Sequence, residues 1–159
     1  MLKPLTTTFL FLIALSASLF ARDIDLNRLA SDAAQHNKHL FVWLHKTDCG
    51  YCEAMREFTL QDDAIASVVK ASFVFVHINV NEKDIVTFKT FKGSGKAFAK
   101  EVGYSFYPSS LFMDAKADIV FAAPGYIEER DFAVMLKFVR SGAYKKMGYD
   151  CFRRQEEKN

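Results

Sequence analysis

The chain has 159 residues, of which 50% are hydrophobic and 16 are phenylalanine, so it has room for one domain with one aromatic core. The net charge is +2, and no run of lysine and arginine is interleaved with aromatic residues, which argues against a nucleic-acid partner. The chain contains no internal repeat and no linker that would divide it. These properties indicate a single globular domain.

The N-terminus has the three parts of a secretory signal peptide. Lys3 supplies a positive start, residues 9–15 are apolar, and residues 16–21 are mostly small. The alternative is an uncleaved membrane anchor, but the apolar stretch is interrupted by Thr and Ser and falls short of the roughly 20 residues that span a bilayer. We therefore expect cleavage after Ala21, export to the periplasm and no stable membrane insertion of the mature protein.

The spacing of apolar residues predicts alternating helices and strands in the mature chain. Helices are expected at residues 25–36, 49–58, 64–70, 95–102 and 128–141, and strands at 40–44, 72–80, 109–113 and 118–123. The strand at 72–80 is rich in β-branched and aromatic residues, which indicates a central buried strand. Residues 81–94 are polar and less regular. The predicted domain covers residues 22–142, and residues 143–159 are expected to form a charged, mobile tail.

Two cysteines, Cys49 and Cys52, lie where an apolar strand gives way to a helix. At a helix start, free backbone N–H groups and the positive end of the helix dipole stabilise a thiolate. Cys49 is therefore expected to be the attacking sulfur, and Cys52, about one turn later, the sulfur that resolves the mixed disulfide. A purely structural disulfide is the alternative, but so short a loop contributes little stability when closed.

Several motifs resemble those of exported thioredoxin-like proteins, over roughly residues 25–140. They are the Cys-x-Tyr-Cys-x-x-Met phrase at 49–55, the Phe-Val-x-Val strand at 73–76, the aromatic-Pro turn at 107–112 and the Pro-Gly-Tyr at 124–126. The order of the predicted elements is also similar to that of this family. The resemblance implies an α/β thioredoxin fold, with a central mixed sheet of about four strands flanked by helices.

The resemblance also implies roles for individual residues. Cys49 is similar to the family's nucleophile, Cys52 to its resolving thiol, and Pro108 to its cis-proline, which packs against the dithiol in the catalytic site. An ordinary trans proline at a strand start is the alternative for Pro108, because X-Pro bonds are generally trans. The implied substrate-binding residues are Gly50, Tyr51 and Tyr107.

One position departs from the pattern of thioredoxins proper. They hold a buried acid six residues before the first cysteine, where it assists proton transfer to the resolving thiol; Trp43 occupies that position. Trp43 is expected to be a core residue, so Glu53 or a water would have to serve in its place. Asp48, adjacent to Cys49, opposes thiolate formation slightly, and no extreme pKa is expected for Cys49.

These features together predict a periplasmic thiol–disulfide oxidoreductase that reduces protein disulfides without an organic cofactor. Its partners would be protein disulfide or dithiol substrates and a membrane-borne thiol electron donor that recharges it. A disulfide isomerase or an oxidase of the same fold is the alternative. Periplasmic isomerases that share the Gly-Tyr dipeptide carry a separate dimerisation domain, for which this chain has no residues.

A copper-binding module is a further alternative, with Cys49, Cys52 and His45 as soft ligands. A closed zinc site normally needs four ligands, and the chain has no second cysteine pair. We therefore predict no metal in the site. His77 lies within an apolar strand and is expected to be a core or edge histidine. Cys151 is expected to be a free surface thiol, with an intermolecular disulfide as the alternative.

Overall fold

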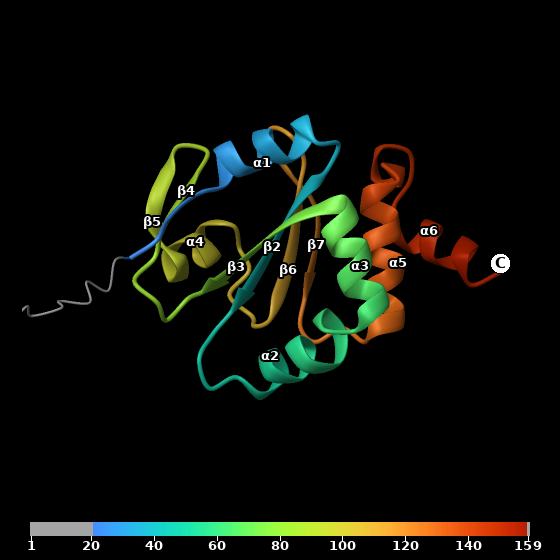
Figure 1. Cartoon of the computed structure of the whole chain (residues 1–159), viewed down its shortest axis with the longest axis horizontal. Coiled ribbons are helices and arrows are strands. Elements are labelled where there is room, and N and C mark those ends of the chain that lie inside the picture. Colours follow the sequence, from blue (N-terminus) through green and yellow to red (C-terminus); the bar gives the residue numbers. More distant parts are fainter. Residues whose placement is uncertain (1–20, 159) are drawn as a thin grey trace, which may run out of the picture.

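A computed structural model of the chain describes residues 21–158 (Figure 1). Its main sheet has four strands in the order β3-β2-β6-β7, of which β2 and β3 are parallel while the other neighbouring pairs are antiparallel. The mixed sheet expected from the sequence is confirmed. The strands are β2 (His39–His45), β3 (Phe73–Asn79), β6 (Ser109–Met113) and β7 (Ile119–Pro124).

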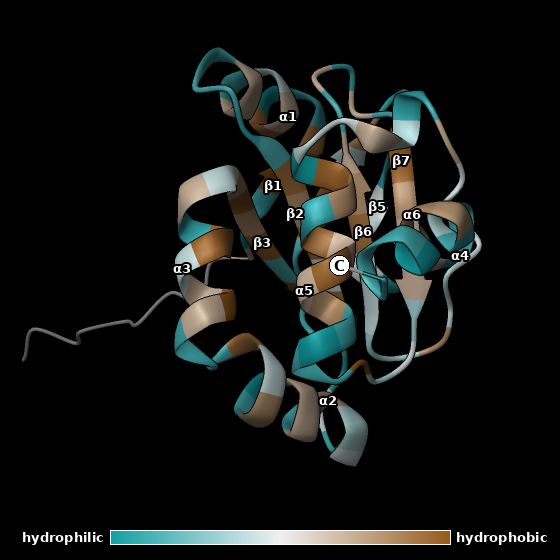
Figure 2. Ribbon diagram, turned by 90° about the vertical axis from the view of Figure 1, so that its right-hand side faces the viewer, coloured by the Kyte–Doolittle hydropathy of each residue, from teal (hydrophilic) through white to brown (hydrophobic). Residues whose placement is uncertain are grey.

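Helices cover both faces of this sheet (Figure 1). They are α1 (Leu26–Gln35), α2 (Gly50–Ala54), α3 (Asp63–Ser72), α4 (Gly95–Glu101), α5 (Glu129–Arg140) and α6 (Tyr149–Glu156), together with a π-helical segment (Met55–Leu60) that continues α2. In Figure 2 the strands are mostly hydrophobic, whereas the helices alternate between hydrophobic and hydrophilic positions, as expected where one helix face covers a sheet.

The central strand β2 divides the core in two, because successive side chains of a strand point to opposite faces. Leu40, Val42 and Leu44 pack into a cluster with α1 and α4, while Phe41 and Trp43 pack into a second cluster with α3 and α5. The second cluster contains both Cys49 and Cys52. The dithiol is therefore built onto the aromatic half of the core.

Strand β3 is an edge strand, and the prediction of a central position for it is wrong. Among the described residues only β2 pairs with it. Residues expected to be irregular instead form a hairpin that makes a second sheet with β1. The strands of that sheet are β1 (Asp23–Asp25), β4 (Ile85–Phe88) and β5 (Phe91–Ser94). The predicted burial also fails in the middle of β3, where Phe75 and His77 are exposed and Val74 and Val76 are only partly buried. A run of apolar, β-branched residues therefore indicates a strand but not its place in the sheet.

The segment after Gly142, for which the sequence predicts a charged tail, continues as a 3-10 turn (Ala143–Lys145) and helix α6. Phe152 is buried, and the centroid of its ring lies 5.3 Å from that of Phe138 on α5. This contact anchors α6 to the domain. Lys137 on α5 also forms an ion pair with Glu156. The many charged residues around Phe152 led to the prediction of a tail, although this one buried aromatic residue is enough to attach the helix.

The predicted signal peptide at residues 1–21 lies almost entirely outside the described residues. Within residues 21–158, none of the helices combines the length and the apolar character needed to cross a bilayer.

Replacing Phe152 with Ala is expected to destabilise the protein by about 3 kcal/mol, since it removes the aromatic ring that fastens α6 to α5. Urea unfolding monitored by circular dichroism measures this loss. The neighbouring variant Cys151→Ala is the control, because Cys151 is exposed on the same helix and its removal should leave the midpoint unchanged. Equal midpoints for both variants would show that α6 contributes nothing to stability.

Candidate active site

Cys49 and Cys52 form a disulfide at the start of α2. Cys49 is the N-cap residue, with extended backbone angles of φ −120° and ψ 99°, and its sulfur accepts a hydrogen bond from the Cys52 N–H at 3.2 Å. A helix N-cap side chain normally satisfies one of the free N–H groups of the first turn. In the reduced protein the same N–H and the helix dipole would stabilise a Cys49 thiolate.

The two cysteine residues differ in solvent exposure. Cys49 retains 7% of its surface, whereas Cys52 retains 1% and is packed in the cluster that includes Trp43 and Met55. A substrate can therefore reach Cys49 before it reaches Cys52. This difference fits the predicted roles of Cys49 as the attacking sulfur and Cys52 as the resolving sulfur.

The loop before β6 brings a second backbone segment to the disulfide. The Tyr107–Pro108 peptide bond is cis, as the resemblance implied, and Cys49 Sγ lies 3.8 Å from the Tyr107 carbonyl oxygen. Two hydrogen bonds hold the loop: Gly125 N–H donates to the Pro108 carbonyl at 2.7 Å, and Ser109 Oγ donates to the Phe106 carbonyl at 2.6 Å. Residues 58 positions apart in the chain, Cys49 and Tyr107, thus meet in one site.

Exposed aromatic side chains belong to both segments of the site. Tyr51 in the dithiol motif is 72% exposed, and Phe106, two residues before Pro108, is 76% exposed. Gly50 adds no bulk, and a Cβ placed there would meet nothing within 4 Å. Phe106 was missed by the sequence analysis. Its position in the aromatic pair before Pro108 was the available signal, but sequence does not tell which aromatic of a pair faces solvent.

Trp43 is a buried core residue, as predicted. Its Nε1 and the Oγ of its cross-strand partner Ser110 are both buried without a hydrogen-bond partner within the described part of the chain. Glu53, considered as a replacement for the missing acid, is ion-paired with Arg56 and exposed. Trp43 therefore occupies the position of the family's acid, and Ser110, which was not predicted as part of the site, is its cross-strand partner.

His45 does not join the cysteines in a three-ligand group. Its Nε2 lies 3.4 Å from His77 Nδ1, and its ring stacks on Trp43 with centroids 4.4 Å apart. In the described region, residues 21–158, no cluster of three or more His, Cys, Asp or Glu side chains is arranged to hold a metal ion. The copper site composed of Cys49, Cys52 and His45 thus gains no support from this geometry.

Burial lowers the pKa of His45 to about 4, with a smaller contribution from the nearby His77. Because the folded pKa is depressed from 6.5, the unfolded chain binds more protons than the folded chain. Stability from this group is thus fully present above about pH 6.5 and is lost as the pH falls towards 4. We expect a loss of about 1–2 kcal/mol, after allowing for solvent screening of a partly buried ring.

Urea unfolding at pH 7.5 and pH 4.5 measures this loss, and the His45→Gln variant isolates the contribution of His45. Between the two pH values, the free energy of unfolding of the variant should fall by about 1–2 kcal/mol less than that of the unmodified protein. An identical pH dependence in both proteins would contradict the assignment.

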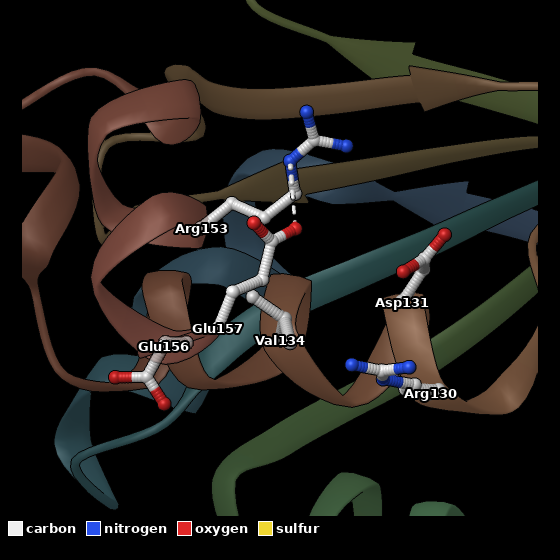
Figure 3. Close-up of a pocket in the computed structure, with 6 residues that line it drawn as sticks. All are labelled: Arg130, Asp131, Val134, Arg153, Glu156 and Glu157. Carbon is white, nitrogen blue, oxygen red and sulfur yellow. Dashed lines mark ion pairs between the residues drawn. The ribbon is translucent and has the colours of Figure 1, made fainter. Parts of the chain in front are cut away.

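A charged pocket between α5 and α6 contains no residue of the dithiol or of the Pro108 loop (Figure 3). Acidic and basic side chains of both helices line it, and Arg153 pairs with Glu157 at 3.9 Å. Its lining residues are Arg130, Asp131, Val134, Arg153, Glu156 and Glu157. Two basic and three acidic side chains line the pocket, and two of the acidic ones already have ion-pair partners, Glu157 with Arg153 and Glu156 with Lys137. The dithiol therefore remains the candidate active site.

The fold and the dithiol together define a thiol–disulfide oxidoreductase. Residues 26–140 match the family model of the thioredoxin-like domain, and the chain belongs to that family. A search of curated proteins found no significant match.

Solved structures share the fold at low sequence identity. A thioredoxin-fold protein from Helicobacter pylori has 19% identity and a TM-score of 0.62, covering 84% of this chain and 89% of that chain. A thioredoxin from Thermus thermophilus has 23% identity and a TM-score of 0.57, covering 75% and 86%. The C-terminal domain of DsbD from Neisseria meningitidis, in its reduced form, has 15% identity and a TM-score of 0.51, covering 69% and 88%. These likenesses establish the fold.

Proposed function

We propose that the protein is an exported reductase of protein disulfides that uses the Cys49–Cys52 dithiol. The observation that carries this proposal is the pairing of Cys49, the N-cap residue of α2, with the more deeply buried Cys52, beside the backbone of Tyr107. The hydrophobic N-terminal residues 1–21 support export to the periplasm.

The reaction begins with the reduced protein. The Cys49 thiolate attacks one sulfur of a client disulfide, forming an intermolecular S–S bond and releasing the other client sulfur as a thiolate that takes up a proton. Cys52 then loses its proton and attacks Cys49 Sγ, which breaks the intermolecular bond and releases the second client thiolate. The client gains two electrons, and the protein is left with the Cys49–Cys52 disulfide.

The client chain would dock between the dithiol turn and the Pro108 loop. The Tyr107 backbone lies beside Cys49, and the bare surface at Gly50 leaves room for an approaching chain. Exposed Tyr51 and Phe106 provide apolar contact area that is tolerant of client sequence. These features favour client proteins whose chain is unfolded or extended around the cysteine that is attacked.

A reductase in an oxidising compartment needs a source of electrons. Each turnover leaves the protein oxidised, so a membrane-borne dithiol donor would have to reduce the Cys49–Cys52 disulfide by the same exchange in reverse. The glycine at the second position of the motif is more similar to that of reductants than to that of strong oxidants, which supports this direction.

The reduction potential of the Cys49–Cys52 pair tests the direction of electron flow. The protein is equilibrated in glutathione buffers, and the fraction of free thiol is measured by alkylation. We expect a value near about −270 mV, the range of thioredoxin. A value near about −120 mV, the range of the strong periplasmic oxidant, would make the protein an oxidase and overturn the proposal.

A further inference from the structure

Two histidines face each other on neighbouring strands of the main sheet. His45 Nε2 and His77 Nδ1 are 3.4 Å apart, while the ring centroids are 5.6 Å apart. Since the centroids are separated by more than the nitrogens, the two nitrogens lie between the rings. The register explains this contact: Trp43 is paired with His77, so His45 is a diagonal neighbour of His77 on the same sheet face.

The two rings line an open pocket of about 310 Å³ whose wall is mostly apolar. Trp43 stacks on His45 and holds its orientation, while His77 lies on the exposed edge strand β3 and is accessible from solvent. The full lining consists of Trp43, His45, Arg56, Leu60, Gln61, Phe75 and His77. A small ion can therefore reach the nitrogens without passing through the core.

We propose that His45 and His77 bind one monovalent copper ion between their facing nitrogens. Imidazole nitrogen is a good ligand for copper, and Cu(I) forms stable linear complexes with two ligands. A structural zinc site would need four ligands, and the described chain, residues 21–158, offers no third His, Cys, Asp or Glu in a cluster with this pair. The facing arrangement therefore suits Cu(I) better than zinc.

The geometry requires only a small adjustment. If each metal–nitrogen bond is about 2 Å, as for imidazole on zinc, a linear N–Cu–N unit spans about 4 Å. The nitrogens are 3.4 Å apart, so the rings must separate by roughly 0.6 Å. A side-chain rotation of His77 can supply this movement, since His77 is exposed on an edge strand.

The charges around the pair do not exclude a cation. Two guanidinium groups act on His45, but each has an acidic partner: Arg56 is paired with Glu53, and Arg22 with Asp84 at 2.5 Å. These pairings offset part of the positive charge, although both guanidinium groups still lower the pKa of His45. Binding involves no electron transfer and none of the cysteines, so it stands independently of the proposed reductase activity.

The test uses the full chain with Cys49, Cys52 and Cys151 all replaced by Ser, because thiols would otherwise compete for copper. Cu(I) is supplied anaerobically as its coloured bicinchoninate complex, and loss of colour reports transfer to the protein. We expect one equivalent of Cu(I) to transfer, and the added substitution His77→Phe to reduce the bound copper at least tenfold. The matched control His36→Phe alters an exposed histidine whose ring is hydrogen-bonded to the Asp32 carbonyl of α1, and this variant should bind normally.

A second readout does not depend on the histidine variant being folded. Cu(I) added to the thiol-free protein should shift the NMR signals of the His45 and His77 rings and quench the fluorescence of Trp43, the single tryptophan of the chain. If no copper transfers, the pair is only a hydrogen bond and the proposal fails. It fails equally if His77→Phe leaves binding unchanged, or if the pair binds Zn²⁺ but not Cu(I).

Discussion

Replacing Cys49 with Ser is expected to abolish the reduction of insulin disulfides, bringing the rate down to that of the assay without protein. A serine hydroxyl at the helix N-cap stays protonated near neutral pH, so no thiolate remains to attack the client. The buried Cys52 cannot replace it, because only 1% of its surface is accessible. Insulin turbidity in the presence of excess dithiothreitol measures the rate.

The matched variant Cys52→Ser separates the two sulfurs. It retains the attacking thiolate but cannot resolve the intermolecular disulfide, so client protein should accumulate as a covalent adduct visible on a non-reducing gel. Cys151→Ser serves as the control for unrelated thiol chemistry, since that exposed cysteine lies on α6. Activity of Cys49→Ser close to that of the unmodified protein would refute the assigned role of Cys49.

Replacing Phe112 with Ala is expected to destabilise the protein by about 3–5 kcal/mol, which corresponds to a fall of roughly 10 °C or more in Tm. Phe112 is fully buried on β6, and its ring stacks on Phe41 at 4.8 Å between the centroids. Rings of Phe73 and Phe132 lie 5.6 and 6.3 Å away, so the lost ring leaves a cavity bordered by large, immobile groups. Calorimetry measures the change.

Phe58→Ala is the matched control for this core substitution. Phe58 is 59% exposed on the π-helical segment, so its removal should change stability by less than about 0.5 kcal/mol. A loss of similar size in both variants would mean that the aromatic cluster does not carry the stability of this half of the core.

The elements around the dithiol could be predicted from the sequence because their signals are local. The apolar run of β2 and the helix start at Cys49 depend on neighbouring residues alone. The role of Pro108 could be expected only through the resemblance, since neither composition nor spacing indicates which loop will meet Cys49. The exposed Phe106 and the buried Ser110 were not predicted because their environment is made by distant segments.

The sequence by itself determined the place of the dithiol at a strand–helix junction and the order along the chain of the four main-sheet strands and the helices α1 to α5. The resemblance implied the α/β fold, while β1, the β4–β5 hairpin and α6 were not predicted. Tertiary structure alone decided that β3 is an edge strand, that Phe152 fastens α6 to the domain, and that His45 meets His77. The physical reason is that hydrophobic periodicity records which face of an element is buried, whereas the partner against which it is buried depends on strand order and register. Strand order and register bring together residues that are far apart in the chain, so local sequence patterns do not reveal them.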